Sequence, residues 1–254
     1  MTRTFVTEDL TVRYGGLTAL HGVSITVEPG EFAGLIGPNG AGKTTFIDAV
    51  TGFTPATGRV TLGDVAMLPL PAHRRVGAGL SRTFQNLELF EDLTVRENVL
   101  VATERSHWWS PVAEFVRPVS SRLSEVVEEV LDLVGLAAHV DAYPPDLSLS
   151  ARKLVSVARA LAGRPSVLLL DEPAAGLDSD ASLALGEQLR RVAASGVSVL
   201  LVDHDMDLVL RTCERINVLD FGKLIASGPT AQVREDPAVV AAYLGHADDA
   251  EAIA

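Results

Sequence analysis

The sequence predicts an α/β fold built on a parallel sheet, because short apolar runs alternate with helical patterns along the chain. The runs Glu31–Ile36, Ser166–Leu170 and Val197–Val202 are nearly continuously apolar, and turn residues bound each of them. Runs of this kind are typical of strands that are buried on both faces, as in a parallel sheet. Helical patterns lie between the strands, and this alternation is the sequence pattern of an α/β core.

Three segments carry the helical patterns of this core. They are Lys43–Val50, ended by Gly52; Ser182–Ala194, ended by Gly196; and Asp205–Cys213. Glycine often follows the last residue of a helix, because it adopts the left-handed conformation without a steric cost. We therefore expect a helix over each segment, packed against the sheet.

The amino-terminal segment has a different pattern. Phe5–Val27 alternates polar and apolar residues around Tyr14-Gly-Gly16. Alternation with a period of two predicts strands that are buried on one face, and the glycine pair predicts a turn between them. We therefore expect two antiparallel strands before the first buried run.

The middle of the chain predicts a helical subdomain inserted into the α/β core. Residues 87–157 contain no run comparable to the three buried ones, and Ser121–Val134 has apolar residues at helical spacing. We expect one domain in which residues 1–86 and 158–245 form the core with its β subdomain. Residues 87–157 then form the helical subdomain, and residues 246–254 are expected to be a frayed tail.

Composition narrows the classes of function. The chain has 254 residues and a formal net charge of −12, which argues against broad contact with the phosphates of DNA or RNA. Its one cysteine, Cys213, excludes an internal disulfide and is typical of a reducing cytoplasm. No apolar run approaches the roughly 18–20 residues that cross a bilayer, and the first residues lack the apolar stretch of a signal peptide. We therefore expect a cytoplasmic globular protein with no nucleic-acid partner.

A glycine-rich segment between the first buried run and the first helix matches the phosphate-loop pattern G-x-x-x-x-G-K-[ST]. Its glycines let successive backbone N–H groups face one point, and the helix that follows adds the positive end of its dipole. Lys43 offers an ammonium group to the β- and γ-phosphates, and the Thr44 hydroxyl reaches Mg²⁺. The alternative is a glycine turn that caps a helix and happens to contain a lysine. The residues expected to bind ATP here are Gly37, Asn39, Gly40, Ala41, Gly42, Lys43, Thr44 and Thr45.

Two carboxylates follow the second buried run. Asp171 and Glu172 come directly after Val167–Leu170. Ligands bind at the carboxyl ends of the strands in open α/β sheets, so this pair is expected beside the phosphate loop. We expect Asp171 to hold Mg²⁺, directly or through water, and Glu172 to polarise the attacking water as a general base. The alternative is a solvated acidic turn before Pro173.

Four further residues occur in an order that narrows the family. Gln85 lies in Arg82-Thr-Phe-Gln-Asn86, Asp178 ends Ala174-Ala-Gly-Leu-Asp178, His204 follows the third buried run, and Tyr14 precedes the phosphate loop. Together with the loop and the acidic pair, this order resembles the ATP-binding-cassette family from end to end. The resemblance implies a RecA-like core with an inserted helical subdomain, and it implies ATP and Mg²⁺ as ligands.

The resemblance also implies a role for each of these residues. Tyr14 would stack on adenine, and Asp178 would lie at a dimer interface. Gln85 would contact Mg²⁺ and sense the membrane partner. His204 would contact the γ-phosphate and the attacking water. Taken singly, each has a structural interpretation as well: a core or surface tyrosine, a solvated glutamine, or a satisfied histidine at the end of a strand.

Within that family, the sequence is similar to the ATP-binding subunits of branched-chain amino-acid importers. The similarity rests on Tyr14–Ala19, Leu80–Asn86, Leu93–Asn98, His204–Met206 and Val240–Gly245. It implies two integral membrane permease subunits, a second ATP-binding subunit and, indirectly, a solute-binding protein, with a heterodimer favoured over a homodimer. It also implies a place at the cytoplasmic face of the membrane, with residues 87–115 turned toward the permeases. Importers of urea and short amides have a similar pattern.

The family signature Leu-Ser-Gly-Gly-Gln is altered in this chain. It falls at Leu147–Ala151, where Ser148 is kept but Leu149, Ser150 and Ala151 replace Gly-Gly-Gln. In family dimers this segment closes over the partner's ATP, and the serine and nearby N–H groups bind the γ-phosphate. A side chain at positive φ costs about 1–2 kcal/mol, so the altered segment is expected to serve the partner poorly. This predicts a heterodimer with one full-strength site, on this chain's own phosphate loop, and one weakened site. In a homodimer both sites would be weak.

Two other functions stay open. The altered signature also fits a regulatory nucleotide-binding subunit with little hydrolysis, although Glu172 and His204 argue against it. Family members that act on ribosomes or DNA typically carry two cassettes or a long coiled-coil insertion, whereas this sequence shows one cassette and a short helical insertion. Trp108-Trp109 lies in the segment expected to face the permeases, and His73–Arg75 is a basic cluster expected on the surface.

Overall fold

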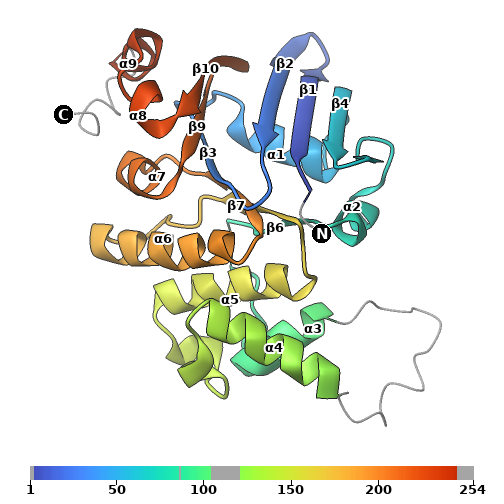
Figure 1. Cartoon of the computed structure of the whole chain (residues 1–254), viewed down its shortest axis with the longest axis vertical. Helices are drawn as coiled ribbons and strands as arrows, with labels where there is room; N and C mark the ends of the chain where they lie inside the picture. Colours follow the sequence, from blue (N-terminus) through green and yellow to red (C-terminus); the bar gives the residue numbers. More distant parts are fainter. Residues whose placement is uncertain (1–2, 86, 104–120, 245–254) are drawn as a thin grey trace. The chain divides into compact units, whose positions relative to one another are not determined.

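The computed structural model of the chain describes residues 3–85, 87–103 and 121–244. The chain divides into two compact units (Figure 1). The first unit consists of Met1–Gln85 and Pro165–Ala254, and the second is Asn86–Arg164. The segment 87–157, expected to be helical, falls within the second unit.

The described strands of the first unit form two sheets, and the larger one is mostly parallel. Its six strands run in the order β10-β9-β3-β8-β7-β6. β10 pairs antiparallel with β9, and the other neighbours are parallel. The predicted parallel sheet is confirmed, with the three predicted buried runs as β3, β7 and β8. The strand bounds are β3 Phe32–Ile36, β6 Leu80–Arg82, β7 Val167–Asp171, β8 Ser198–Val202, β9 Arg215–Asp220 and β10 Lys223–Pro229.

The register of the central strands brings three carboxyl ends together. Leu35 of β3 pairs with Val202 of β8, and Val202 pairs with Asp171 of β7. Every residue of these three strands is buried, which explains why their sequences read as continuous apolar runs. The loops that follow β3, β7 and β8 therefore begin side by side.

The smaller sheet is antiparallel, as the alternating amino-terminal pattern predicted. Its described strands run in the order β2-β1-β4-β5. Tyr14 pairs with Leu17 across a two-residue turn, in which Gly15 has a φ of 60°. Positive φ is what such hairpin turns require, and glycine supplies it without strain. The bounds are β1 Phe5–Tyr14, β2 Leu17–Val27, β4 Thr57–Leu62 and β5 Val65–Ala66.

Helices cover both faces of the larger sheet. Ala33 and Leu35 of β3 join a buried apolar cluster with α1 and the smaller sheet. Gly34, between them, faces α7 instead, because a Cβ there would lie 2.9 Å from Val209. The three helices predicted in the core are confirmed as α1, α6 and α7. The helices of the first unit are α1 Lys43–Thr51, α2 Ala72–Ala78, α6 Ser179–Ala194, α7 Met206–Thr212, α8 Thr230–Val233 and α9 Pro237–Leu244 (Figure 1).

The regular elements among the described residues of the second unit are all helices, and no strand occurs there. The predicted helix over Ser121–Val134 is confirmed as α4, and α3 packs against both α4 and α5. The expected frayed tail, 246–254, and the tryptophan pair Trp108-Trp109 lie outside the described residues. The elements are α3 Val95–Thr103, α4 Ser121–Leu133 and α5 Leu149–Ala162, with short 3-10 helices at Ala137–His139 and Pro144–Asp146.

None of the helices in the described parts of either unit is both long enough and apolar enough to cross a membrane.

The basic cluster at residues 73–75 is only partly on the surface. His73 and Arg74 are exposed, but Arg75 is 5% exposed, so the surface assignment of Arg75 is wrong. Its guanidinium donates to the carbonyl oxygens of Ala49 and Val50 at the end of α1, both at 2.8 Å. The physical reason is that the last carbonyls of a helix lack partners within the helix, and an arginine fork satisfies two of them at once.

Cys213 yields a prediction about alkaline stability. Burial raises the pKa of its thiol from 9.0 to about 12, so the folded protein keeps the proton where the unfolded chain loses it. The free energy of unfolding should therefore fall by about 1.4 kcal/mol per pH unit above pH 9 on account of this group. Urea unfolding between pH 8 and 10.5 should show a smaller loss of stability with pH for Cys213→Ala than for the unaltered protein. Equal slopes would contradict the assignment.

Candidate functional site

The glycine-rich loop between β3 and α1 has a shape that only glycine permits at two positions. Gly37 has a φ of 155°, and a Cβ there would lie 2.1 Å from the carbonyl oxygen of Leu219. Gly42 has a φ of 105°, and a Cβ there would lie 2.9 Å from the side chain of Leu20. Side chains at either position would force the loop away from its neighbours. The loop is thus held tightly against β9 and β2.

The amino end of α1 suits an anion. Gly42 precedes the helix, no side chain caps its first N–H groups, and its first turn contains no acidic residue. Lys43 is 7% exposed, and its ammonium donates to the carbonyl oxygens of Gly37 and Pro38 at 2.6 and 3.1 Å. Thr44 is exposed and Thr45 half-buried. Uncapped N–H groups, the helix dipole and an adjacent ammonium make a phosphate site.

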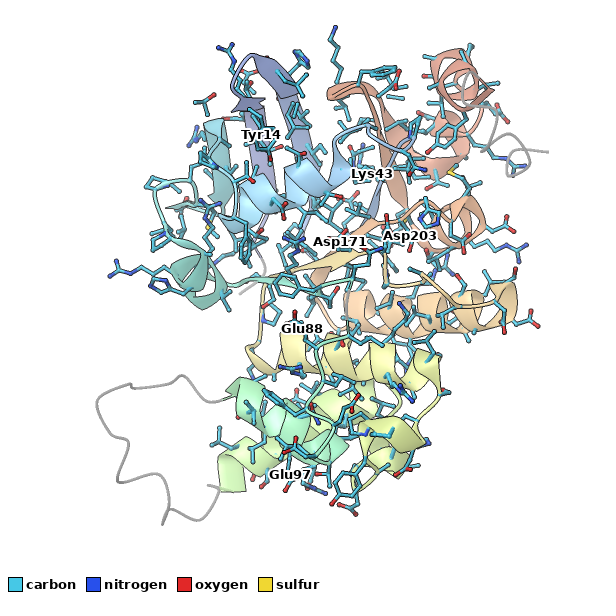
Figure 2. All side chains as sticks on the ribbon, turned by 180° about the vertical axis from the view of Figure 1, so that it is seen from behind. Tyr14, Lys43, Glu88, Glu97, Asp171 and Asp203 are labelled. Carbon is cyan, nitrogen blue, oxygen red and sulfur yellow. The ribbon has the colours of Figure 1, made fainter. Side chains whose placement is uncertain are left out.

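Asp171 ends β7 with its carboxylate nearly buried. The guanidinium of Arg82 donates to Asp171 Oδ2 at 2.9 Å and to Asp48 Oδ1 at 2.6 Å. Burial raises the pKa of Asp171, and the hydrogen bond and charge of Arg82 oppose that rise. Asp171 and Arg82 therefore form a buried ion pair beside the phosphate loop's helix. Figure 2 shows Asp171 close to Asp203, at the ends of neighbouring strands.

Glu172 follows in a strained backbone conformation. Its φ is 45°, in the left-handed region, which costs a residue with a side chain about 1–2 kcal/mol. Its backbone N–H donates to the carbonyl oxygen of Val202 at 2.7 Å, so the strained residue is anchored to the end of β8. Strain of this kind concentrates at functional sites, where the surrounding structure can hold it.

Glu172 lies between two polar side chains that the sequence had also singled out. Gln85 Nε2 donates to Glu172 Oε2 at 2.9 Å. His204 Nδ1 lies 3.8 Å from Glu172 Oε1, and the histidine side chain is 58% exposed. The structure therefore brings Gln85, Glu172 and His204 together at the carboxyl ends of β7 and β8, where solvent or a ligand can reach them.

Asp203 belongs to this site but was not predicted from the sequence. It is 0% exposed, and its Oδ1 accepts the backbone N–H groups of His204 and Asp205 at 2.8 and 3.0 Å. Its Oδ2 accepts the N–H of Ala174 at 3.3 Å. Burial raises the pKa of this carboxyl. Asp203 thus ties the segment after Glu172 to the segment that carries His204. The sequence did contain a sign of Asp203, because it is a carboxylate that directly follows a buried strand, β8.

The remaining predicted residues lie elsewhere. Tyr14 ends β1, is 49% exposed, and its hydroxyl lies 3.3 Å from that of Thr54. Asp178 caps α6 by accepting the N–H of Ala181 at 2.8 Å. Ser148, in the second unit, caps α5 by accepting the N–H of Ala151 at 3.2 Å. These three residues make none of the contacts that join Gln85, Glu172 and His204.

The three residues predicted to bind Mg²⁺ all carry oxygen atoms that can serve as its ligands. Thr44, Gln85 and Asp171 offer hydroxyl, amide and carboxylate oxygens, the ligands that Mg²⁺ prefers. Among the described residues, no three His, Cys, Asp or Glu side chains cluster tightly enough to hold a metal. Mg²⁺ is commonly bound by one or two carboxylates together with substrate phosphates, so this oxygen set needs the nucleotide to complete it.

Comparison with known proteins gives a consistent family. Residues 20–175 match the family described as ABC transporter, and residues 223–249 match the branched-chain amino acid ATP-binding cassette transporter family. The chain is 38% identical over 247 residues to the high-affinity branched-chain amino acid transport ATP-binding protein BraF of Pseudomonas aeruginosa, covering 94% of this chain and 96% of BraF. It is 36% identical over 245 residues to LivG of Escherichia coli K12, with the same coverage.

A solved structure agrees with these sequence matches. The ADP conformation of MJ1267, an ATP-binding cassette of an ABC transporter, superposes with a TM-score of 0.85 at 31% identity, covering 97% of this chain and all of that one. The fold is that of an ATP-binding cassette of an ABC transporter. The chain therefore belongs to the ABC transporter family, as an ATP-binding subunit that hydrolyses ATP to drive transport.

Proposed function

We propose that this chain binds Mg-ATP in its Gly37–Thr45 loop and hydrolyses it with Glu172 as general base. The observation that carries the proposal is the contact of Glu172 with Gln85 and its approach to His204, at the ends of strands whose neighbour leads into the loop. The transported solute is a branched-chain amino acid or a related small polar solute, by analogy with the names of BraF and LivG.

The nucleotide is held mainly through its phosphates. The backbone N–H groups of the loop and the start of α1 bind phosphate oxygens, and Lys43 exchanges its carbonyl partners for the β- and γ-phosphates. Tyr14, half exposed at the end of β1, offers its ring to adenine. Thr44, Asp171 and the amide oxygen of Gln85 would hold Mg²⁺. When bound, Mg²⁺ neutralises charge that develops on the phosphates.

Glu172 accepts the proton of the attacking water. Gln85 donates to Oε2, which leaves Oε1 directed toward the side of His204. His204 donates a hydrogen bond to the γ-phosphate and helps to place the water. Because the carboxylate is 25% exposed and anchored through its backbone, it is held in place yet open to water.

The site is completed by a second ATP-binding subunit. In the family dimer, the signature segment of one chain closes over the ATP of the other, so this chain's loop needs a partner. Here Leu149 and Ser150 occupy the first turn of α5, where the family has glycines, and Leu149 is 40% exposed. The bulk of these side chains favours a heterodimer in which this chain's own loop forms the stronger site. The altered signature is also what a regulatory subunit with little hydrolysis would show.

The membrane partners are two permease subunits, which this chain meets at the cytoplasmic face of the membrane. A solute-binding protein delivers the solute to the permeases. The first unit has an apolar cavity of about 230 Å³ next to the segment that ends in Gln85. Its walls include Phe53, Val76 and Phe84, with exposed fractions of 61%, 54% and 46%. Exposed apolar side chains gathered around a hollow are typical of partner surfaces. We propose that this cavity receives an apolar side chain of a permease subunit.

The first prediction for the proposed function concerns Glu172→Gln in the assembled dimer. Removing the general base from the stronger site should lower ATP turnover about 100-fold, whereas ATP binding should stay within about twofold. The matched change in the partner cassette should lower turnover much less. Steady-state hydrolysis and binding of a fluorescent ATP analogue measure both. Turnover near the unaltered value would rule out Glu172 as base and, with it, the asymmetric dimer.

The second prediction concerns Asp203→Asn. The amide would place an N–H₂ group against a backbone N–H that now donates to the carboxylate. The segment after Glu172 and the segment that carries His204 would then lose a hydrogen bond that joins them. We expect a free energy of unfolding lower by about 1–3 kcal/mol and a turnover about tenfold lower, with little change in ATP affinity. Asp64→Asn, at an exposed turn, is the control. If turnover is unchanged, Asp203 has no part in arranging the site.

The third prediction concerns Val76→Asp at the wall of the apolar cavity. A carboxylate facing an apolar side chain of a permease costs at least about 1.4 kcal/mol, so association should weaken tenfold or more. Co-purification with the permeases measures this, and ATP binding by the isolated chain should not change. Leu17→Asp, at an exposed apolar residue of the smaller sheet, is the control. Equal recovery of permeases with both variants would exclude the cavity as the docking place.

A further inference from the structure

Arg82 contacts the candidate site through two carboxylates, although the sequence assigned it no role. It is the last residue of β6, and its side chain is 10% exposed. One end of its guanidinium, Nη2, donates to Asp171 Oδ2 at 2.9 Å. The other, Nη1, donates to Asp48 Oδ1 at 2.6 Å and approaches Thr51 Oγ1 at 3.5 Å. Asp48 and Thr51 belong to α1, so one arginine joins the end of β7 to the helix that follows the phosphate loop.

Stability alone does not explain this arrangement. Buried ion pairs lose about as much in desolvation as they gain in attraction, and apolar replacements are often neutral or stabilising. Arg82 carries a further cost, because its Nε is buried and has no hydrogen-bond partner among the described residues. A buried donor without a partner costs about 1–3 kcal/mol. A side chain kept at such a cost is better explained by the geometry that it imposes.

Two aromatic rings fix the plane of the guanidinium. The Phe84 and Phe53 ring centroids lie 4.9 and 5.7 Å from the central carbon of Arg82. The two rings meet edge to face at 6.0 Å. Rings on a guanidinium hold it by cation–π attraction and limit its rotation. The direction in which Arg82 presents its two amino groups is therefore set from several sides.

We propose that Arg82 is a positioning residue for the magnesium carboxylate. It binds Asp171 through Oδ2 and leaves Oδ1 for the metal, while its grip on Asp48 fixes the distance from that carboxylate to the phosphate-loop helix. The two carboxylates exceed the one guanidinium by a charge of −1, so the group still attracts a cation. This role rests on the proposed function of Asp171 as a magnesium ligand.

The test compares Arg82→Met, which removes the charge, with Arg82→Lys, which keeps the charge but loses the fork. The control is Arg59→Met, because Arg59 pairs with Glu8 at 3.4 Å on the surface of the smaller sheet. Binding of a fluorescent ATP analogue to the full chain is measured in EDTA and over a range of free Mg²⁺. Both Arg82 variants should bind within about twofold of the unaltered chain in EDTA. In both variants, the free Mg²⁺ concentration that gives half of the Mg²⁺-dependent increase in binding should be about tenfold higher. A loss of this size is typical when a residue that orients a metal ligand is removed.

Each other outcome overturns the proposal in a distinguishable way. Loss of binding in EDTA as large as the loss with Mg²⁺ would show a general structural role. A lower Mg²⁺ requirement in Arg82→Met, with Arg82→Lys unchanged, would show that only the charge of Arg82 matters. An unaltered chain whose binding does not respond to Mg²⁺ would refute the assignment of Asp171 itself. If Arg82→Met does not fold, Arg82→Lys still tests the proposal, because an unchanged Mg²⁺ requirement in that variant would overturn it.

Discussion

The site depends on the register between three parallel strands. Because Leu35, Val202 and Asp171 lie abreast, the phosphate loop, the His204 segment and Glu172 all begin at the same edge of the sheet. A slip of one residue in β7 would turn Asp171 to the opposite face and separate it from Arg82. The apolar faces of these strands make such a slip costly, since every strand residue would exchange its helix neighbours. Packing of the core therefore fixes the chemistry at its edge.

The edge itself contains groups that are unfavourable in isolation. Glu172 has a positive φ, and Asp203 is a carboxylate with no exposed surface. Arg82 has a buried N–H group that finds no hydrogen-bond partner in the described part of the chain. Each costs on the order of 1–3 kcal/mol, which is a sizeable part of the stability of an ordinary domain. The fully buried strands beneath them offset that cost. Rigid strands thus allow the loops above to hold strained and charged groups in one arrangement.

Sequence patterns predicted the parts of the fold and site that depend on neighbours in the chain. The buried runs, the phosphate loop and the carboxylates after β7 are local patterns, and the resemblance added Gln85 and His204. Contacts between distant segments were not predictable. Arg75 looked like a surface residue because its helix gives no sign of the α1 carbonyls it reaches. The contacts of Arg82 with Asp48 and Asp171 span 34 and 89 residues, and the contact of Asp203 with Ala174 spans 29, so no local pattern indicated them.

Ser148, which the altered signature keeps, caps α5. Ser148 accepts an N–H bond from its own helix, but its hydroxyl hydrogen stays available to donate to a phosphate oxygen. Capping and phosphate binding are therefore compatible in this residue, as the cap uses its oxygen and the phosphate its hydrogen. Leu149 and Ser150 add side chains to the first turn of α5, where the proposed dimer would bring a phosphate of the partner's ATP. In the proposed dimer this added bulk would weaken binding of the partner's ATP and would leave this chain's own phosphate loop unaffected.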